Sequence, residues 1–124
     1  MANPVIALAM GDPCGISPEL TAKVVALDEV HKAARVIVIG DRRVFDEGAR
    51  IAAITPTVEF VDLKHLDPAT VQRGVASKAG GASALANYRH ALRMAADGKA
   101  SAEAPPALLA TPRWTVDGSR CFRS

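Results

Sequence analysis

The strongest candidate for chemistry in the sequence is the loop from Gly11 to Ser17, which reads Gly-Asp-Pro-Cys-Gly-Ile-Ser. Ligands of α/β proteins bind at loops that follow parallel strands, and free N–H groups at a helix N-terminus attract anions. Gly11 and Gly15 would let a ligand approach the backbone closely. The spacing matches neither G-x-G-x-x-G nor G-x-x-x-x-G-K-[ST], and Asp12 puts a carboxylate where a phosphate would lie. Two interpretations stay open: a tight turn with a helix cap, which the spacing alone favours, and a ligand-binding loop.

Two further stretches carry side chains suited to binding. Asp41-Arg42-Arg43 follows a predicted strand. In a dinucleotide site an acidic residue there takes a ribose hydroxyl and an arginine a 2′-phosphate, whereas the simpler alternative is a helix cap followed by two solvated arginines. Residues 77–82, Ser-Lys-Ala-Gly-Gly-Ala, form a second glycine-rich helix entrance. Lys78 there is suited to an anionic substrate or a partner subunit, and the alternative is a flexible loop with one solvated lysine.

The histidines and cysteines show no site by their spacing. His31, His65 and His90 share no metal-ligand spacing, and no Ser-His-Asp arrangement can be argued. Cys14 lies near a predicted helix N-terminus, but it lacks a partner histidine and is more simply interpreted as a small packed residue. The residue types therefore assign no metal ligand and leave the catalytic residues unknown.

Alternating strands and helices are expected to position these loops. Apolar runs at residues 5–10, 35–40 and 58–63 predict strands, and the four successive β-branched residues at 36–39 are typical of a buried parallel sheet. Residues 65–73 are predicted to form a loop or edge element with a turn at Asp67-Pro68. The order β-α-β-α-β-loop-α predicts an α/β fold, a partial and mostly parallel sheet with flanking helices.

Three helices are predicted between the strands. The first begins at Ser17, which is expected to cap it, with Pro18 and Glu19 suited to its first turn. The second is capped by Asp41, and the third covers residues 77–96 and stops at Gly98. Helical spacing places three sets of apolar residues on single helix faces: Leu20, Val24 and Leu27; then Val44, Phe45 and Ile51, which are expected to face inward; then Leu85, Tyr88, Leu92 and Ala95.

Length and composition limit the class of protein. The chain has 124 residues, enough for one domain, and is 49% hydrophobic but only 4% aromatic. Its basic residues are scattered and its net charge is +2, which argues against a nucleic-acid partner. No apolar stretch approaches a membrane span, and the N-terminus lacks the pattern of a signal peptide. Cys14 and Cys121 form no disulfide framework, so a cytoplasmic, reducing location is expected.

The character of the sequence changes after about residue 100. Residues 101–124 hold three of the chain's eight prolines and no convincing strand or helical period. We therefore divide the chain into an α/β segment, residues 1–100, and an irregular tail, residues 101–124.

The stretch from Ile6 to Glu19, Ile-Ala-Leu-Ala-Met-Gly-Asp-Pro-Cys-Gly-Ile-Ser-Pro-Glu, resembles the opening of the 4-hydroxythreonine-4-phosphate dehydrogenase family. Residues 36–41 resemble the family's second strand and turn, and residues 74–98 resemble the helix before its next core strand. Residues 77–82 are closer to a sister branch that acts on other four-carbon acid phosphates. The resemblance covers roughly residues 3–100.

The resemblance implies an oxidation that depends on NAD or NADP and on a divalent metal ion. The substrate would be a phosphorylated hydroxy acid, 4-hydroxythreonine 4-phosphate, in the biosynthesis of pyridoxine and pyridoxal phosphate, where the β-keto acid product loses carbon dioxide. The implied fold is similar to that of the isocitrate and isopropylmalate dehydrogenases, in a homodimer with its active site at the subunit interface. Gly11, Asp12, Pro13 and Gly15 would then border the cofactor.

The chain also departs from the family pattern. Family members are far longer, and their metal-binding histidines come later than any position matched here, so none of the three histidines takes that role. We expect an N-terminal fragment that is inactive alone, with a tail that resembles an out-of-frame translation. Two alternatives are a small non-catalytic α/β module that binds a nucleotide or an anion at the loop from Gly11 to Ser17, and a poorly folded product without activity.

Overall fold

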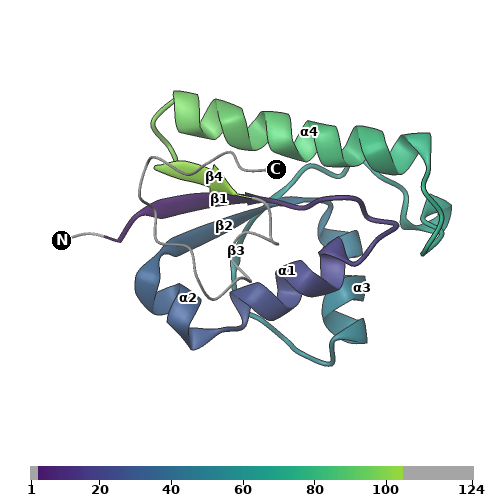
Figure 1. The fold of residues 1–124 in the computed structure, drawn as a ribbon, viewed down its shortest axis with the longest axis horizontal. Coiled ribbons are helices and arrows are strands. Elements are labelled where there is room, and N and C mark those ends of the chain that lie inside the picture. Colours follow the sequence, from purple (N-terminus) through teal and green to yellow (C-terminus); the bar gives the residue numbers. More distant parts are fainter. Residues whose placement is uncertain (1–2, 105–124) are drawn as a thin grey trace, which may run out of the picture.

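A parallel sheet of four strands lies at the centre of the computed structural model, which describes residues 3–104 (Figure 1). The strands are β1 (Val5–Ala9), β2 (Arg35–Gly40), β3 (Glu59–Asp62) and β4 (Ala102–Ala104). They lie in the order β3-β2-β1-β4, and every neighbouring pair is parallel. The predicted α/β class with a parallel sheet is confirmed.

Helices cover both faces of the sheet (Figure 1). On one face lie α1 (Ser17–Val25), α2 (Asp28–Ala33) and α3 (Arg42–Ile51), and on the other lies the long helix α4 (Lys78–Ala96). The predicted turn at Asp67-Pro68 opens a short 3-10 helix, η1 (Pro68–Thr70). The stop at Gly98 is also confirmed, because this residue takes a positive φ of 74° directly after the helix cap.

Two apolar clusters hold these layers together. Phe45 and Leu8 are the largest side chains of the cluster under α1 and α3, and both are almost completely buried. The cluster under α4 is built from smaller residues: Ala7, Ala9, Ile39, Ala91, Met94 and Ala100. At the contact between α1 and α3, Gly48 lies so close to the backbone of Pro18 that an added Cβ would be 2.4 Å from the Pro18 carbonyl carbon.

Two predictions about helix faces are wrong. Leu27 does not share a face of α1 with Leu20 and Val24, because α1 ends at Val25 and Leu27 is the extended, 47% exposed residue before α2. Ile51 is 37% exposed, since it is the last residue of α3 and the buried face of that helix ends at Ala49.

The expectation that no strand follows α4 is also wrong. Ala102–Ala104 pair with Ile6, Ala7 and Leu8 of β1 as a short edge strand. Ser101 precedes this strand, and its backbone N–H donates to the carbonyl oxygen of Val5 at 2.7 Å. Alanine and glutamate do not favour strands, so the sequence composition did not indicate this strand, which is held by backbone pairing. Residues 105–124 of the predicted tail lie outside the described residues.

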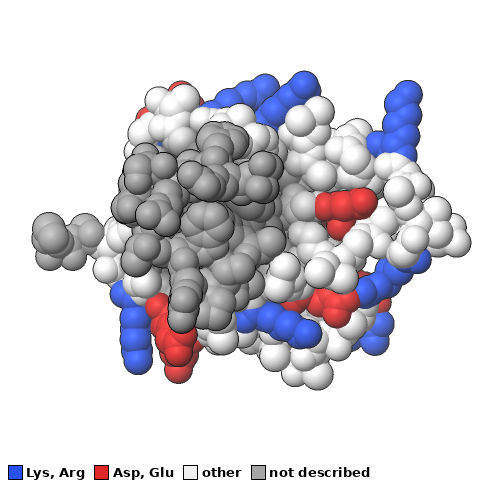
Figure 2. Space-filling view, viewed as in Figure 1, with Lys and Arg blue, Asp and Glu red and all other residues white. Residues whose placement is uncertain are grey.

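The surface of the described part carries charges of both signs. On the face shown in Figure 2, Lys and Arg lie beside Asp and Glu along the lower edge, whereas those along α4 at the top are mostly basic. None of the helices within residues 3–104 has the length and apolar character needed to span a membrane.

Candidate functional site

The order of the strands marks one place on the sheet as suited to ligand binding. Along the chain the strands progress from β1 to β2 to β3, and the chain then crosses over the other face to place β4 on the opposite side of β1. In parallel sheets, ligands bind outside the carboxyl ends of the strands where the order reverses in this way. The reversal lies between β1 and β4, and the loop from Gly11 to Ser17 leaves the sheet at that point.

Hydrogen bonds within this loop fix its shape. The N–H of Gly11 donates to Ser17 Oγ at 2.7 Å, and the N–H of Gly15 donates to the backbone carbonyl oxygen of Asp12 at 3.1 Å. Asp12 Oδ1 accepts the N–H of Cys14 at 2.9 Å. Ser17 therefore closes the loop and does not cap α1, whose N-cap is Ile16, so the predicted capping role of Ser17 is wrong.

The second glycine-rich entrance lies against this loop. Ser77 caps α4, and its Oγ accepts the N–H of Gly80 at 3.0 Å. The same Oγ lies 3.6 Å from Cys14 Sγ. At Gly80 an added Cβ would be 2.7 Å from Asp12 Oδ1 and 3.2 Å from Cys14 Sγ. The two entrances, more than 60 positions apart in sequence, thus form one structure, which places the Asp12 carboxylate near the positive N-terminal end of α4.

Residues 71–77 form a strap between η1 and α4 that is tied to the same loop. The N–H of Gly74 donates to the carbonyl oxygen of Cys14 at 2.8 Å, and Gly74 has a positive φ of 79°. Next to it, the Arg73 guanidinium pairs with Glu19 of α1. Apart from half-buried Val71, the residues of this strap are exposed, whereas Cys14 is buried.

Asn87 joins α4 to the end of β1 and was not among the predicted site residues. It is 1% exposed, and its Nδ2 donates to the carbonyl oxygen of Met10 at 3.0 Å. Among the described residues its Oδ1 has no hydrogen-bond partner. The sequence does hold a pattern that could have found it, since Ser83, Asn87 and Ala91 recur at spacings of four along one helix face.

The structure favours the cap interpretation of Asp41-Arg42-Arg43. Asp41 is 1% exposed, caps α3 by accepting the N–H of Arg43, and also accepts the N–H of Leu66 at 3.2 Å. The Arg43 side chain donates to both carboxylate oxygens of Asp41, and this interaction holds the pKa of Asp41 below its ordinary value. Arg42 lies over the rings of Phe45 and Phe60. The carboxylate of Asp41 already has protein partners at both oxygens and is buried, so it is poorly placed for a ribose hydroxyl.

The histidines lie at separate places. His65 Nε2 is 3.1 Å from Ser83 Oγ, whereas His31 Nε2 contacts the carbonyl oxygen of Val25, and His90 is half-buried on α4. Within residues 3–104 no group of three or more His, Cys, Asp or Glu side chains is arranged to hold a metal ion.

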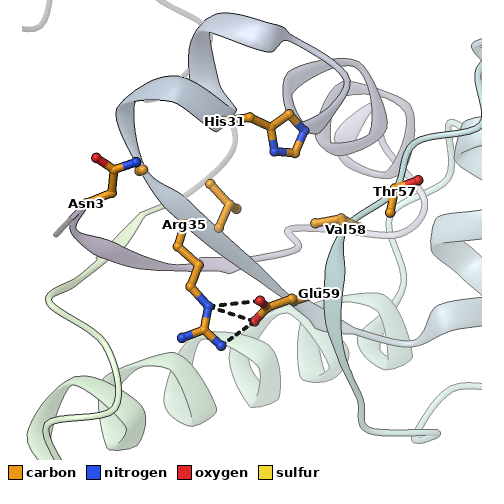
Figure 3. Close-up of a pocket in the computed structure, with 8 residues that line it drawn as sticks. Asn3, His31, Arg35, Thr57, Val58 and Glu59 are labelled. Carbon is orange, nitrogen blue, oxygen red and sulfur yellow. Dashed lines mark hydrogen bonds and ion pairs between the residues drawn. The ribbon is translucent and has the colours of Figure 1, made fainter.

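Cavities lie at both ends of the strands in the part of the chain that the structure describes. One of about 420 Å³ lies at the amino ends of β2 and β3, where Arg35 and Glu59 form a hydrogen-bonded pair (Figure 3). That edge is opposite to the one where the strand order predicts a ligand. The other cavity, of about 360 Å³, lies beside the loop from Gly11 to Ser17 and includes Pro13 and Pro18 in its lining. Its charged residues are Arg43, Glu47 and Arg73.

Comparisons with known proteins add a family relationship. A protein of Rhizobium meliloti (strain 1021) with the provisional name 4-hydroxythreonine-4-phosphate dehydrogenase 2 is 54% identical over 116 residues, which cover 81% of this chain and 33% of that protein. A provisionally named D-threonate 4-phosphate dehydrogenase of Symbiobacterium thermophilum is 31% identical over 81% of this chain and 35% of its own length. The chain thus spans about a third of these relatives. No protein-family profile matches it.

A solved structure shares the fold. The crystal structure of a 4-hydroxythreonine-4-phosphate dehydrogenase from Burkholderia phymatum aligns with a TM-score of 0.80 at 25% identity. The alignment covers 85% of this chain and 36% of that one. The predicted resemblance to this group of dehydrogenases is confirmed.

Proposed function

Because the chain is homologous to about one third of the 4-hydroxythreonine-4-phosphate dehydrogenases, we propose that it supplies the cofactor-bordering α/β segment of an enzyme of this kind. The reaction would be the oxidation of a 4-phosphorylated hydroxy acid, in pyridoxine and pyridoxal phosphate biosynthesis or in the related oxidation of D-threonate 4-phosphate. A bound NAD or NADP would accept the hydride. The observation that carries this proposal is the 54% identity, in a chain whose predicted binding loop lies at the reversal of strand order.

The loop from Gly11 to Ser17 is the part of this chain that we assign to the cofactor. Gly15 is exposed, and an added Cβ there would meet only the carbonyl oxygen of Asp12, at 3.6 Å. A ligand can therefore come close to the backbone beside Gly15. Asp12 keeps its Oδ2 available to accept a hydrogen bond, since the contacts of the carboxylate within the described residues are made through Oδ1. We propose Gly11, Asp12, Pro13 and Gly15 as the residues that border the cofactor.

A divalent metal ion is part of the proposed reaction, but the described residues do not fit it. No suitable group of three ligands lies within residues 3–104, and the described histidines lie apart. We therefore assign no metal ligand to the described chain and derive no catalytic step through the ion. The remaining two thirds of the relatives' length is where we expect the ligands.

Three further properties belong to the same proposal. The substrate class is a phosphorylated small molecule, the assembly is a homodimer, and the location is the cytoplasm, with neither a nucleic-acid nor a membrane partner. The names of the relatives, which are dehydrogenases of phosphorylated compounds, support the substrate class. The homodimer and the cytoplasmic location are implied by the family resemblance. We also keep the division into residues 1–100, the dehydrogenase segment, and residues 101–124, an irregular tail apart from β4.

The alternative of a small non-catalytic module that binds a nucleotide or an anion has less support. Its site would need free N–H groups in the loop, yet those of Gly11, Cys14 and Gly15 already donate within the loop. The carboxylate of Asp12 would also repel an anion, so in the proposed site this loop would meet a hydrogen-bond donor of the cofactor and not its phosphates.

A chimera tests the proposal. Residues 1–100 replace the matching segment of the Rhizobium meliloti relative, and reduction of NAD and NADP is measured with 4-hydroxythreonine 4-phosphate and with D-threonate 4-phosphate, in the presence of a divalent metal ion. We expect turnover by the chimera and none by the 124-residue chain alone. In the chimera, Gly15→Val should raise the KM for the cofactor, whereas Gly81→Ala should not. Turnover by the chain alone, or a folded but inactive chimera, would refute the proposal.

A further inference from the structure

Helix α4 presents its larger apolar side chains to solvent. The face that packs on the sheet consists of Gly80, Ser83, Asn87, Ala91 and Met94, which are mostly small or polar. On the outer side, Leu85, Tyr88 and Leu92 are 48%, 43% and 41% exposed. A helix that only covers a sheet turns its large apolar residues inward. This helix therefore has a second packing face, which the described residues leave uncovered.

The exposed residues form a continuous stripe. Gly81, Leu85, Tyr88 and Leu92 follow one another at spacings of four, three and four, the spacing that lines up the seam between two packed helices. The stripe spans about three helical turns. At Gly81 nothing lies within 4 Å of an added Cβ, so a partner can approach the helix backbone there. The shape thus suits another helix.

Basic side chains accompany the stripe. Residues 78–96 include Lys78, Arg89 and Arg93 and contain neither aspartate nor glutamate. None of the ion pairs found within residues 3–104 involves these three side chains. Figure 2 shows that Lys and Arg also prevail along the edge of the visible face formed by α4. The surface therefore attracts a negatively charged partner.

We propose that the outer face of α4 is a docking site for an amphipathic helix of another polypeptide, with an apolar stripe flanked by Asp and Glu. Charge argues against two nearer occupants, α4 of a second copy and the chain's own residues 105–124. A second copy of α4 would bring basic flanks against basic flanks, which is unfavourable. The chain's own residues 105–124 contain Arg113, Arg120 and Arg123 against one acidic residue, Asp117, and are basic as well.

Synthetic helices of about 20 residues test this proposal. Both carry leucine at the seam positions, and they differ only in glutamate or lysine at the flanking positions. Binding of each labelled peptide to the whole chain is measured by fluorescence anisotropy. We expect the glutamate peptide to bind at least about tenfold more tightly than the lysine peptide, a difference of about 1.4 kcal/mol.

Three variants assign the binding to the stripe and its charges. The double variant Leu85→Gln with Leu92→Gln should weaken binding of the glutamate peptide by about tenfold. Arg89→Glu with Arg93→Glu should reverse the preference in favour of the lysine peptide, and Arg50→Glu on α3 should change neither. These side chains are at least 40% exposed or carry charge at the surface, so the fold should persist, as circular dichroism would verify.

Three outcomes would overturn the proposal. They are equal binding of both peptides, binding that the double leucine variant leaves unchanged, and binding to phosphatidylserine vesicles through the stripe without any binding of the glutamate peptide. The last result would assign the surface to an anionic membrane instead. None of these outcomes depends on dehydrogenase activity.

Discussion

The absence of a Cβ at Gly80 allows α4 to approach the loop from Gly11 to Ser17 closely. Gly80→Ala places a Cβ 2.7 Å from Asp12 Oδ1 and 3.2 Å from Cys14 Sγ, so α4 or the loop must shift. We expect a loss of about 1–3 kcal/mol in the free energy of unfolding, measured by urea denaturation.

The next residue provides a matched control. Gly81→Ala meets nothing within 4 Å and replaces a glycine inside a helix, so it should stabilise the protein by up to about 1 kcal/mol. If the two substitutions change stability alike, the close approach of α4 to the loop is not present in solution.

The ionised carboxylate of Asp41 makes the stability of the fold depend on pH. The Arg43 side chain lowers the pKa of Asp41 in the folded state. The stabilisation is therefore complete above the unfolded pKa of about 4 and is lost as the pH falls through the lower folded value. Asp41→Asn should lower the free energy of unfolding by about 1–3 kcal/mol at neutral pH and make it fall less steeply as the pH decreases. Urea unfolding at several pH values measures both effects.

Glu47→Gln is the comparison for that prediction. The Arg50 side chain likewise lowers the pKa of Glu47, but this pair is exposed on α3. Little change in stability is expected because solvent screens such pairs. An equal effect of both substitutions would mean that burial of Asp41 contributes nothing.

Single positions were harder to predict than the pattern around them. The sequence indicated the cap at Asp41 and the glycine-rich loop, because each depends on its nearest neighbours along the chain. It did not indicate that Gly80 touches Asp12 or that Asn87 holds Met10, because both contacts depend on how α4 crosses the sheet.

At the scale of elements, the strap of residues 71–77 contacts buried Cys14 at its middle and at one end, through Gly74 and Ser77, and we expect it to limit access to the thiol. Loss of the Arg73–Glu19 pair should loosen the strap, which also holds the loop through the Gly74 N–H. In a Cys121→Ser background, Arg73→Gln should speed the alkylation of Cys14 by iodoacetamide several-fold, followed by mass spectrometry, since thiol reactivity requires exposure.

Arg50→Gln serves as the control for this experiment. It removes a more exposed ion pair, with Glu47 on α3, and it should leave the alkylation rate unchanged. An unchanged rate in Arg73→Gln as well would show that the strap does not limit access to the thiol.

The elements themselves were largely predictable, and their orientation was not. β1, β2, β3, α3 and α4 lie where apolar runs and helical periodicity predicted them. The stripe of Leu85, Tyr88 and Leu92 has the period of a buried face, but α4 packs through smaller residues and turns the stripe outward. Periodicity shows that residues share a face, and only the packing determines which face is covered.

For the whole molecule, the separated histidines predict that the described fold does not depend on a metal ion. Dialysis against a chelator should leave the thermal midpoint of the chain unchanged, because a ligand bound only by the folded state would raise it. The Rhizobium meliloti relative, treated in the same way, is the reference for a metal-dependent response. A lower midpoint for the chain after chelation would contradict the prediction.

The pairing of β1 with β4 has a consequence for the state of the chain while it is being synthesised. β1 lies between β2 and β4, and the contact between Val5 and Ser101 joins residues 96 positions apart. Such distant contacts slow folding, because the intervening chain must be ordered before they form. On the ribosome, β1 emerges before the other described strands, yet one of its edges stays unpaired until almost all of the described chain has been synthesised. A newly made chain therefore passes through a stage in which its central strand is exposed to pairing with other chains.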